Sequence, residues 1–265
     1  MSERKAILVT GSSHGIGAAT VIAFAKDGYD VGINYNKTPE GAQSVAEECR
    51  RYGVDAQIYQ CDVGRRDQCE RMLNAFINHF GRIDVLVNNA GGALKMPKGG
   101  FVDMPMDYWD EQIALNLNSA AYCSQLAARC MIEKGIHGSI INISSIHSLV
   151  TWVKRKALPY SAGKAGMNMF TKSIGVELIK SGINVNCIAP GLVYTKIMDR
   201  YSERDIRGFE RKIPAGRGGT VDDIVPMIQF LADKKKSSFI VGQTIFIDGG
   251  QSIDGVIDCM LEDEI

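Results

Sequence analysis

A tyrosine and a lysine one helical turn apart form a pair of side chains that could move a proton. Tyr160 and Lys164 are four positions apart in a helical pattern, so their side chains share one face of the helix. An ordinary tyrosine has a pKa of about 10, which is too high for a base at neutral pH. A nearby ammonium favours the phenolate and lowers that pKa. The pair therefore predicts a general acid/base at Tyr160.

A serine at the end of a strand-like run supplies a second chemical group. Ser145 closes the run 140–145, and its hydroxyl could hydrogen-bond a substrate oxygen and orient it toward the tyrosine. Ser144 is adjacent and is expected to point elsewhere. The residues alone leave Ser144, Ser145 and Ser148 as candidates for the catalytic serine.

A glycine-rich turn joins the first expected strand to the first expected helix. The segment 10–17 has the spacing G-x-x-x-G-x-G rather than the commoner G-x-G-x-x-G. Glycine permits a positive φ and lets the backbone approach a ligand closely. The helix N-terminus offers free N–H groups to a pyrophosphate. The turn predicts a dinucleotide site, and a purely structural strand–helix turn is the alternative.

Short apolar runs alternate with longer helical patterns along the chain, which predicts an α/β fold with a doubly wound parallel sheet. The expected strands are 6–10, 30–35, 56–60, 85–87, 139–143, 184–188 and 244–247. The expected helices are 15–27, 39–52, 66–80, 105–134, 160–180 and 221–232. With helices on both faces, these seven strands account for nearly the whole chain, so we expect a single domain over 1–265. Ligands bind such sheets beyond the carboxyl ends of the strands, where the reactive residues fall.

Several motifs, in order, resemble the short-chain dehydrogenase/reductase family. They are T-G-x-x-x-G-x-G at 10–17, N-N-A-G at 88–91, Asn116, Ser145, Y-S-A-G-K at 160–164 and P-G at 190–191. The resemblance covers almost the whole chain and implies a Rossmann fold. Within that family, the chain is similar to NADP-dependent ketone and 3-oxoacyl reductases and to glucose and hydroxysteroid dehydrogenases.

The resemblance implies an oxidoreductase that transfers a hydride between a nicotinamide cofactor and a secondary alcohol or ketone. Its catalytic residues would be Asn116, Ser145, Tyr160 and Lys164. Asn116 would lie in a helix distortion that holds a water and links Lys164 to solvent, with Asn118 as the alternative. An oxidised nicotinamide would add its positive charge to that of the ammonium in lowering the pKa of Tyr160. The alternative function is a non-catalytic dinucleotide sensor, although the chain keeps both the tyrosine and the lysine.

The resemblance also implies which residues line the cofactor. They are Gly11, Ser13, His14, Gly15, Ile16, Gly17, Asn36, Lys37, Asp62, Val63, Asn88, Ala90, Gly91, Tyr160, Lys164, Pro190, Gly191, Val193 and Thr195. Asp62 would accept a hydrogen bond from the adenine amino group, and a cap on the helix 66–80 is its alternative role.

The end of the second strand favours NADP(H) over NAD(H), which stays possible. An acid at this place would bind the ribose 2′-hydroxyl and repel a 2′-phosphate. The segment 33–37 has no acid and ends in Lys37, and His14 lies in the glycine turn. The alternative is that both are solvated turn residues.

Composition narrows the classes of partner. The chain has 30 Lys and Arg against 30 Asp and Glu, so no overall charge draws it to nucleic acid or an anionic membrane. Seven cysteines without a C-x-x-C pair predict no metal site or disulfide framework, and core thiols in a reducing cytoplasm. No apolar run is long enough for a membrane span and no secretory leader is expected. Relatives are commonly oligomers, so a homo-oligomer, a tetramer or dimer, is expected from resemblance.

Substrate identity is expected to reside in three segments, 92–104, 146–159 and 192–217. The last of these is interpreted as a helical lid, with a plain surface helix as the alternative. The basic run 154–156 would attract an anionic substrate or belong to a solvated loop. The tail 252–265 would cover a neighbouring subunit or fray. None of these segments specifies one substrate.

Overall fold

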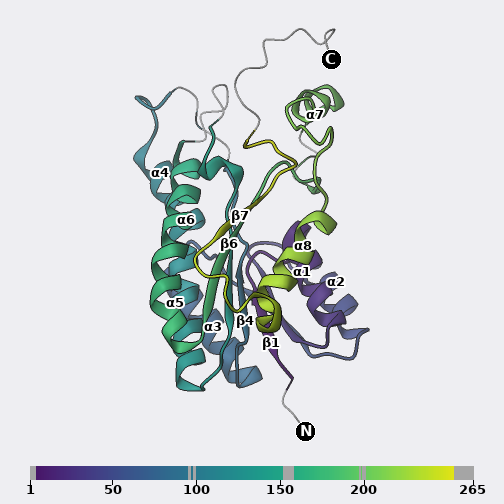
Figure 1. Ribbon diagram of the computed structural model, residues 1–265, viewed down its shortest axis with the longest axis vertical. Coiled ribbons are helices and arrows are strands. Elements are labelled where there is room, and N and C mark those ends of the chain that lie inside the picture. The colour runs from purple at the N-terminus through teal and green to yellow at the C-terminus, as the bar shows by residue number, and fades with distance from the viewer. Residues whose placement is uncertain are drawn as a thin grey trace.

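Seven parallel strands form one sheet, in the order β3-β2-β1-β4-β5-β6-β7, in the computed structural model of the chain (Figure 1). The structure describes residues 4–94, 97, 100–151, 158–196, 198 and 201–253. The strands are β1 (Ala6–Val9), β2 (Asp30–Tyr35), β3 (Ala56–Gln60), β4 (Val85–Asn88), β5 (Ser139–Ile143), β6 (Asn184–Pro190) and β7 (Thr244–Ile247). The strand order reverses between β1 and β4, so the carboxyl ends of these neighbours form the place where such sheets bind ligands.

Helices cover both faces of the sheet, as the sequence predicted (Figure 1). One face carries α1 (Gly15–Lys26), α2 (Glu40–Arg50) and α8 (Val221–Ala232), and the other α3 (Arg66–Phe80), α5 (Ser119–Glu133) and α6 (Leu158–Leu178). The strand β1 shows why both faces are apolar. Ile7 and Val9 point into the first core and Ala6 and Leu8 into the second, because successive side chains alternate across a strand.

The remaining helices lie mostly beyond the carboxyl ends of the strands. They are α4 (Met106–Ile113), α7 (Glu203–Glu210) and, at the opposite end before β7, the short α9 (Lys234–Ser237). The expected helix 105–134 is divided, because a π-helical turn at Ala114–Asn118 separates α4 from α5. The expected lid contains α7, and the basic run 154–156 and the tail from 254 onward lie outside the described residues.

The six described cysteines are buried and free, which confirms their expected place in the core. Cys259 lies outside the described residues. Within the described part of the chain, no group of three or more His, Cys, Asp or Glu could hold a metal ion. No helix of that same part is long and apolar enough to cross a membrane.

One buried amide, that of Asn34 on β2, connects the glycine turn to the sheet. Its Oδ1 accepts from the Gly11 N–H at 2.8 Å. Its Nδ2 donates to the carbonyls of Tyr59 and Cys61 at 3.2 and 3.1 Å. The Ser12 hydroxyl accepts from the Asn34 N–H at 3.0 Å. A buried amide with this many partners holds its surroundings in one arrangement, so the glycine turn has a fixed place at the carboxyl edge.

Candidate active site

Ser145 and Tyr160 come together from β5 and α6 at the carboxyl edge of the sheet. Ser145 follows β5, and its Oγ accepts from the His147 N–H at 3.2 Å. The same side chain is hydrogen-bonded to Tyr160, which lies in the first turn of α6. The His147 ring meets the Tyr160 ring edge to face at 5.9 Å. The two hydroxyls that the sequence singled out therefore meet.

The geometry also separates Ser145 from the two alternative serines. The Ser144 hydroxyl donates to the backbone carbonyl of Lys164 at 3.1 Å, so it faces the helix. The Ser148 hydroxyl donates to the Ser145 carbonyl at 2.6 Å and accepts from Asn168 at 2.8 Å. Both alternatives thus have structural partners, and Ser145 is the serine that contacts Tyr160.

Lys164 lies beneath the tyrosine and is almost fully buried, with 2% of its surface exposed. Its Nζ donates to the Ile143 carbonyl at 2.7 Å and lies 5.9 Å from the centroid of the Tyr160 ring. A Cβ added at Gly91 would lie 3.0 Å from this nitrogen. Because residue 91 is glycine, the backbone after β4 can pass close to the amine of Lys164.

Asn116 joins this group from the π-helical turn, which confirms the expected helix distortion. It is fully buried, and its Oδ1 accepts from the Gly92 N–H at 2.9 Å. Its Nδ2 donates to the carbonyls of Gly92 and Gln112 at 3.1 and 3.0 Å. A Cβ at Gly91 would lie 2.9 Å from Asn116 Oδ1, so the amide and the lysine face the same glycine. The alternative, Asn118, is only half-buried.

The glycine turn fits a pyrophosphate. Gly11 and Gly15 have φ of 61° and 59°, a region that favours glycine. No side chain caps the N-terminus of α1, and its first turn has no acid, so its N–H groups and dipole are available to an anion. A Cβ at Gly17 would lie 2.6 Å from Asn89 Nδ2, and one at Gly15 would lie 3.4 Å from Thr195 Cγ2. Only the backbone and small groups therefore occupy this place.

Other residues expected at the cofactor lie around this turn. Ser13 and Ile16 are half-buried, and Ile16 packs against the core. Pro190 ends β6, and the Gly191 N–H donates to the Ile247 carbonyl at 3.0 Å. Val193 is buried and forms a bridge with Gly219.

Asn88 and Asn89 divide their roles in a way that the sequence reasoning did not foresee. Asn88, which stays a predicted cofactor residue, donates its side-chain Nδ2 to Ser124 and Asn142 inside the protein at 2.9 and 2.8 Å. Asn89 instead donates to the carbonyls of Thr10 and Gly11 at 2.8 and 3.0 Å. Ala90 donates its N–H to the Thr10 hydroxyl at 3.0 Å. Asn89 thus fixes the glycine turn against β4.

The place where adenosine is expected has exposed polar residues, and the segment 36–39 between β2 and Glu40 has no acid. His14, Asn36 and Lys37 are exposed. Asp62 accepts from the Gly64 N–H at 3.0 Å, and α3 has no side-chain cap, so the alternative role of Asp62 as a helix cap is wrong. Val63 is buried and contributes to the core.

Comparisons with known proteins agree with this arrangement. A family model described as enoyl-(acyl carrier protein) reductase matches residues 11–252. The uncharacterized oxidoreductase YohF of Escherichia coli K12 is 36% identical over 244 residues, 92% of this chain and 94% of that protein. The 3-oxoacyl-[acyl-carrier-protein] reductase FabG of Staphylococcus aureus is 36% identical over 250 residues, covering 94% of this chain and 99% of that one.

A solved structure is equally similar. The acetoin dehydrogenase of Enterobacter cloacae superposes with a TM-score of 0.86 at 33% identity, covering 97% of this chain and 99% of that one. The chain belongs to the short-chain dehydrogenase/reductase family. As an oxidoreductase of this family, it has its glycine turn and its Ser, Tyr, Lys and Asn side chains at one edge of the sheet.

Burial weakens the hold of the Lys164 amine on its proton in this short-chain dehydrogenase/reductase. It lowers the pKa of Lys164 from 10.5 to about 8, because a buried ammonium loses its hydration. Near neutral pH the amine is therefore a cation that deprotonates easily.

Burial raises the pKa of Tyr160, and the hydrogen bond from Ser145 offsets part of that rise. This direction is opposite to the lowering that the sequence predicted from the neighbouring ammonium. The phenolate is destabilised where protein excludes water, and Lys164 is itself a weakened cation. In the protein alone, desolvation outweighs the hydrogen bond from Ser145.

Gln112 is a buried neighbour of the site that sequence reasoning missed. It is fully buried on α4, one helical turn before Asn116, and its carbonyl holds the Asn116 amide. Its Nε2 has no hydrogen-bond partner among the described residues. The available signal was the spacing of four between two amides on one helix face.

The lowered pKa of Lys164 predicts that stability rises with pH. Because the amine binds its proton more weakly in the folded protein, the unfolded chain holds more protons between about pH 8 and 10.5, and the free energy of unfolding increases through that window. Urea unfolding is expected to show a gain of roughly 1–2 kcal/mol from about pH 7 to about pH 9.5 relative to Lys164→Met. Lys172→Met, at an exposed position on α6, is the control and is expected to follow the wild type. Parallel curves for wild type and Lys164→Met would contradict the shift.

Proposed function

We propose that the chain is an NADP(H)-dependent enzyme that interconverts a ketone and a secondary alcohol, with Tyr160 as general acid/base. The observation that carries the proposal is the contact of Ser145 with Tyr160 above the buried Lys164. This group lies at the carboxyl edge of strands next to the glycine turn. The names of two relatives, a 3-oxoacyl reductase and an acetoin dehydrogenase, support a carbonyl or hydroxyl substrate.

Each side chain has a part that follows from its position. When bound, the nicotinamide would supply or accept the hydride. Ser145 would donate its hydroxyl to the substrate oxygen and hold that oxygen beside Tyr160. In the reducing direction Tyr160 Oη would give its proton to the carbonyl oxygen, and in the oxidising direction it would take one back. Lys164 would stabilise the phenolate that forms, since its Nζ is the nearby cation.

Asn116 would position a water through which the amine of Lys164 regains a proton from solvent. Its amide is bound to both backbone groups of Gly92, next to Gly91 and Lys164. The π-helical turn leaves backbone groups outside the regular hydrogen-bond ladder, and such turns recur at functional sites. Asn116 would therefore order a water between Lys164 and solvent, as a positioning residue of the relay.

Tyr160→Phe is expected to lower kcat by at least about a thousandfold, because it removes the proton that the substrate oxygen needs. NADPH affinity is expected to change by less than about twofold, since the ring and Lys164 remain. Turnover is followed at the absorbance of reduced nicotinamide across a panel of ketones, and affinity by fluorescence titration. Tyr52→Phe, which removes the hydroxyl of an exposed residue in the turn after α2, is the control. Wild-type turnover in Tyr160→Phe would remove the mechanism, whereas a wild type that binds NADPH and turns over no ketone of the panel would favour the dinucleotide sensor.

The preference for NADP(H) is supported by the charge at the end of β2. Lys37 is exposed there, and no acid is present to repel a 2′-phosphate. His14 lies within the glycine turn, with its Nδ1 3.0 Å from the Ser13 hydroxyl. A phosphate would gain a charge-assisted contact from the lysine, and the 2′-hydroxyl of NAD(H) would not.

Lys37→Ala is expected to weaken NADPH binding by about fivefold and to leave NADH binding within about twofold. The reason is that only NADPH has a phosphate for the amine to contact. Fluorescence or calorimetric titration of both cofactors measures the two affinities, and Lys172→Ala controls for the loss of one surface charge. Tighter binding of NADH than of NADPH by the wild type would defeat the preference.

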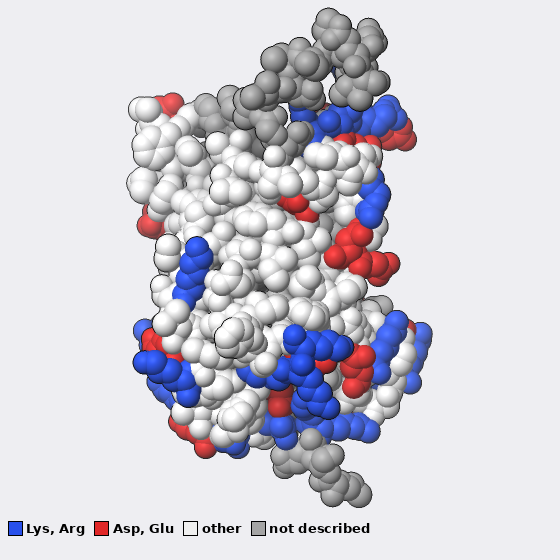
Figure 2. Space-filling view, in the orientation of Figure 1, with Lys and Arg blue, Asp and Glu red and all other residues white. Residues whose placement is uncertain are grey.

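We also propose that the chain is a homo-oligomer, a tetramer or dimer. β7 is an edge strand, and strands with an unpaired edge are templates for association. Figure 2 shows few charged side chains in the middle of the face that Figure 1 views. Phe239, between α9 and β7, is fully exposed. These features support contact with a second copy.

A further inference from the structure

The segment between β6 and α8 leaves the sheet and returns to it with its two ends side by side. Val193 and Gly219 form a parallel bridge. The Tyr194 N–H donates to the Gly219 carbonyl at 2.8 Å, and the Gly219 N–H donates to the Leu192 carbonyl at 2.8 Å. We call the described residues between these ends, 195–196, 198 and 201–217, the lid segment. It contains α7 and begins beside the glycine turn, where Thr195 faces Gly15.

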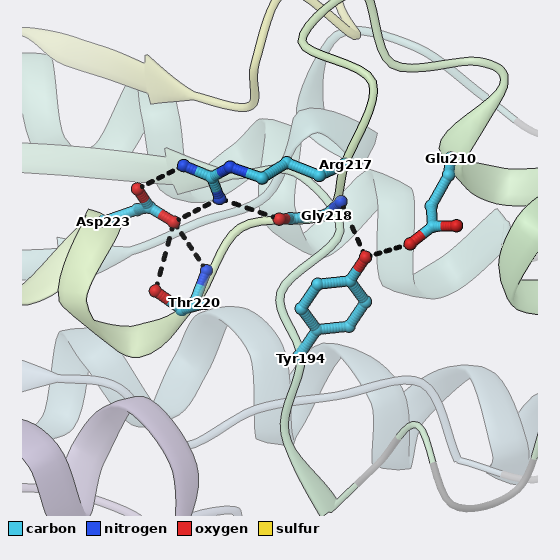
Figure 3. Close-up of polar contacts among 6 residues, drawn as sticks. All are labelled: Tyr194, Glu210, Arg217, Gly218, Thr220 and Asp223. Atoms are coloured by element: carbon cyan, nitrogen blue, oxygen red, sulfur yellow. Dashed lines mark hydrogen bonds and ion pairs between the residues drawn. The ribbon is translucent and has the colours of Figure 1, made fainter.

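We call the bridge of Val193 with Gly219, together with Gly218, the base of the lid segment. Tyr194 connects this base to the end of α7 (Figure 3). Its hydroxyl accepts from the Gly218 N–H at 2.9 Å and donates to the Glu210 carboxylate. The Glu210 contact raises the pKa of the Tyr194 hydroxyl, which keeps it a donor. A Cβ at Gly218 would lie 2.7 Å from Tyr194 Cζ, so the ring rests directly on that glycine. The hydroxyl is therefore held at a fixed point.

Gly218 is itself held by the start of α8 (Figure 3). Arg217 binds Asp223 through two hydrogen bonds of 2.8 and 2.9 Å and donates to the Gly218 carbonyl at 2.9 Å. The Arg217 guanidinium holds the pKa of the Asp223 carboxyl well below its usual range. Asp223 also forms a capping box with Thr220. The base is thus attached to a core helix, and Tyr194 extends it to the lid segment.

The helix α7 has little burial of its own. No residue of α7 is buried. Its capping box, between Ser202 and Asp205, is local, and the edge-to-face contact of Tyr201 with Phe209 at 5.2 Å lies within the lid segment. Contacts of this kind shape the helix without fixing it to the sheet. After the helix, the buried Ile213 and the Ala215 N–H, which donates to the Gly249 carbonyl at 3.0 Å, attach the lid segment to the chain that follows β7. The Tyr194–Glu210 contact is the side-chain contact that joins the last turn of α7 itself to the base.

We propose that Tyr194 and Glu210 form a latch that positions the lid segment over the substrate. Figure 1 places α7 beyond the carboxyl ends of the strands. Ser145 follows the carboxyl end of β5, and Tyr160 lies at the start of α6. The inference rests on the proposed function for the identity of the site. Neither latch residue touches the reacting atoms, so both are positioning residues. Loss of the latch raises the substrate KM, while the chemical step and cofactor binding are kept.

Tyr194→Phe tests the latch most sharply, because it keeps the ring on Gly218 and removes only the hydroxyl. We expect amide hydrogen exchange of 203–210 to accelerate by at least about fivefold, since the helix loses its connection to the base. Tyr52→Phe is the matched control, because Tyr52 donates to Glu48 at 3.0 Å on α2, away from the lid segment. Unchanged exchange of 203–210 in Tyr194→Phe would overturn the latch.

Kinetics test the consequence of the latch. Tyr194→Phe and Glu210→Ala are each expected to raise the KM of a ketone substrate by about tenfold, with kcat within about threefold and NADPH affinity unchanged. The double variant is expected to match the single ones, because both remove the same bond. Glu210→Gln, which keeps an acceptor oxygen for the Tyr194 hydroxyl, is expected to keep the KM of the ketone close to the wild-type value. Additive losses, or a fall in kcat alone, would overturn the positioning role.

The two readouts separate failure of the latch from failure of the proposed function. Hydrogen exchange needs no substrate, so it tests the latch even if the wild type reduces no ketone. If Tyr160→Phe is inactive while Tyr194→Phe keeps wild-type exchange and KM, the function stands and the latch falls. Glu210→Ala alters a half-buried residue at the end of α7 and keeps the test decisive if Tyr194→Phe does not fold.

Discussion

The amine of Lys164 is buried where β5, α6 and the segment after β4 meet, and the active-site geometry depends on keeping it there. Its hydrogen bond to the Ile143 carbonyl fixes the nitrogen against the strand. The loss of hydration weakens its hold on a proton. The nitrogen lies 5.9 Å from the centroid of the Tyr160 ring, so it is placed to stabilise a phenolate that forms there. The same burial opposes ionisation of Tyr160.

Close approach of the backbone around that amine and around the glycine turn explains where this chain has glycine. Gly91 passes between Lys164 and Asn116, and Gly17 passes beneath Asn89. A side chain at either place would displace a polar group that has a partner. Asn34 and Asn89 then hold the turn itself, from β2 and β4 respectively. Asn34 and Asn89 thus fix the turn that we propose binds the anion.

Much of this was predictable from the sequence, because the patterns concerned are local. Such patterns depend only on neighbours along the chain. They include the periodicity of strands and helices, the spacing of Tyr160 and Lys164, and the glycine turn. The strands and the glycine turn lie where they were expected. The division of the helix at Ala114–Asn118 followed from the family resemblance rather than from periodicity.

What escaped prediction depends on contacts between distant segments. The inward turn of Asn88 is set by Ser124 and Asn142, and the rise in the pKa of Tyr160 by the burial around it. The bond from Tyr194 to Glu210 likewise requires the return of the chain at Gly218. No spacing within one element announces such contacts, because folding brings their partners together.

The most direct test of the role of Lys164 is the pH dependence of kcat/KM for alcohol oxidation, measured for the wild type and Lys164→Met. If the amine stabilises the phenolate, the rise of activity with pH moves upward by about one pH unit or more when the amine is removed, along with a fall in rate. A profile in Lys164→Met that keeps the inflection of the wild type, whatever its height, would contradict the account.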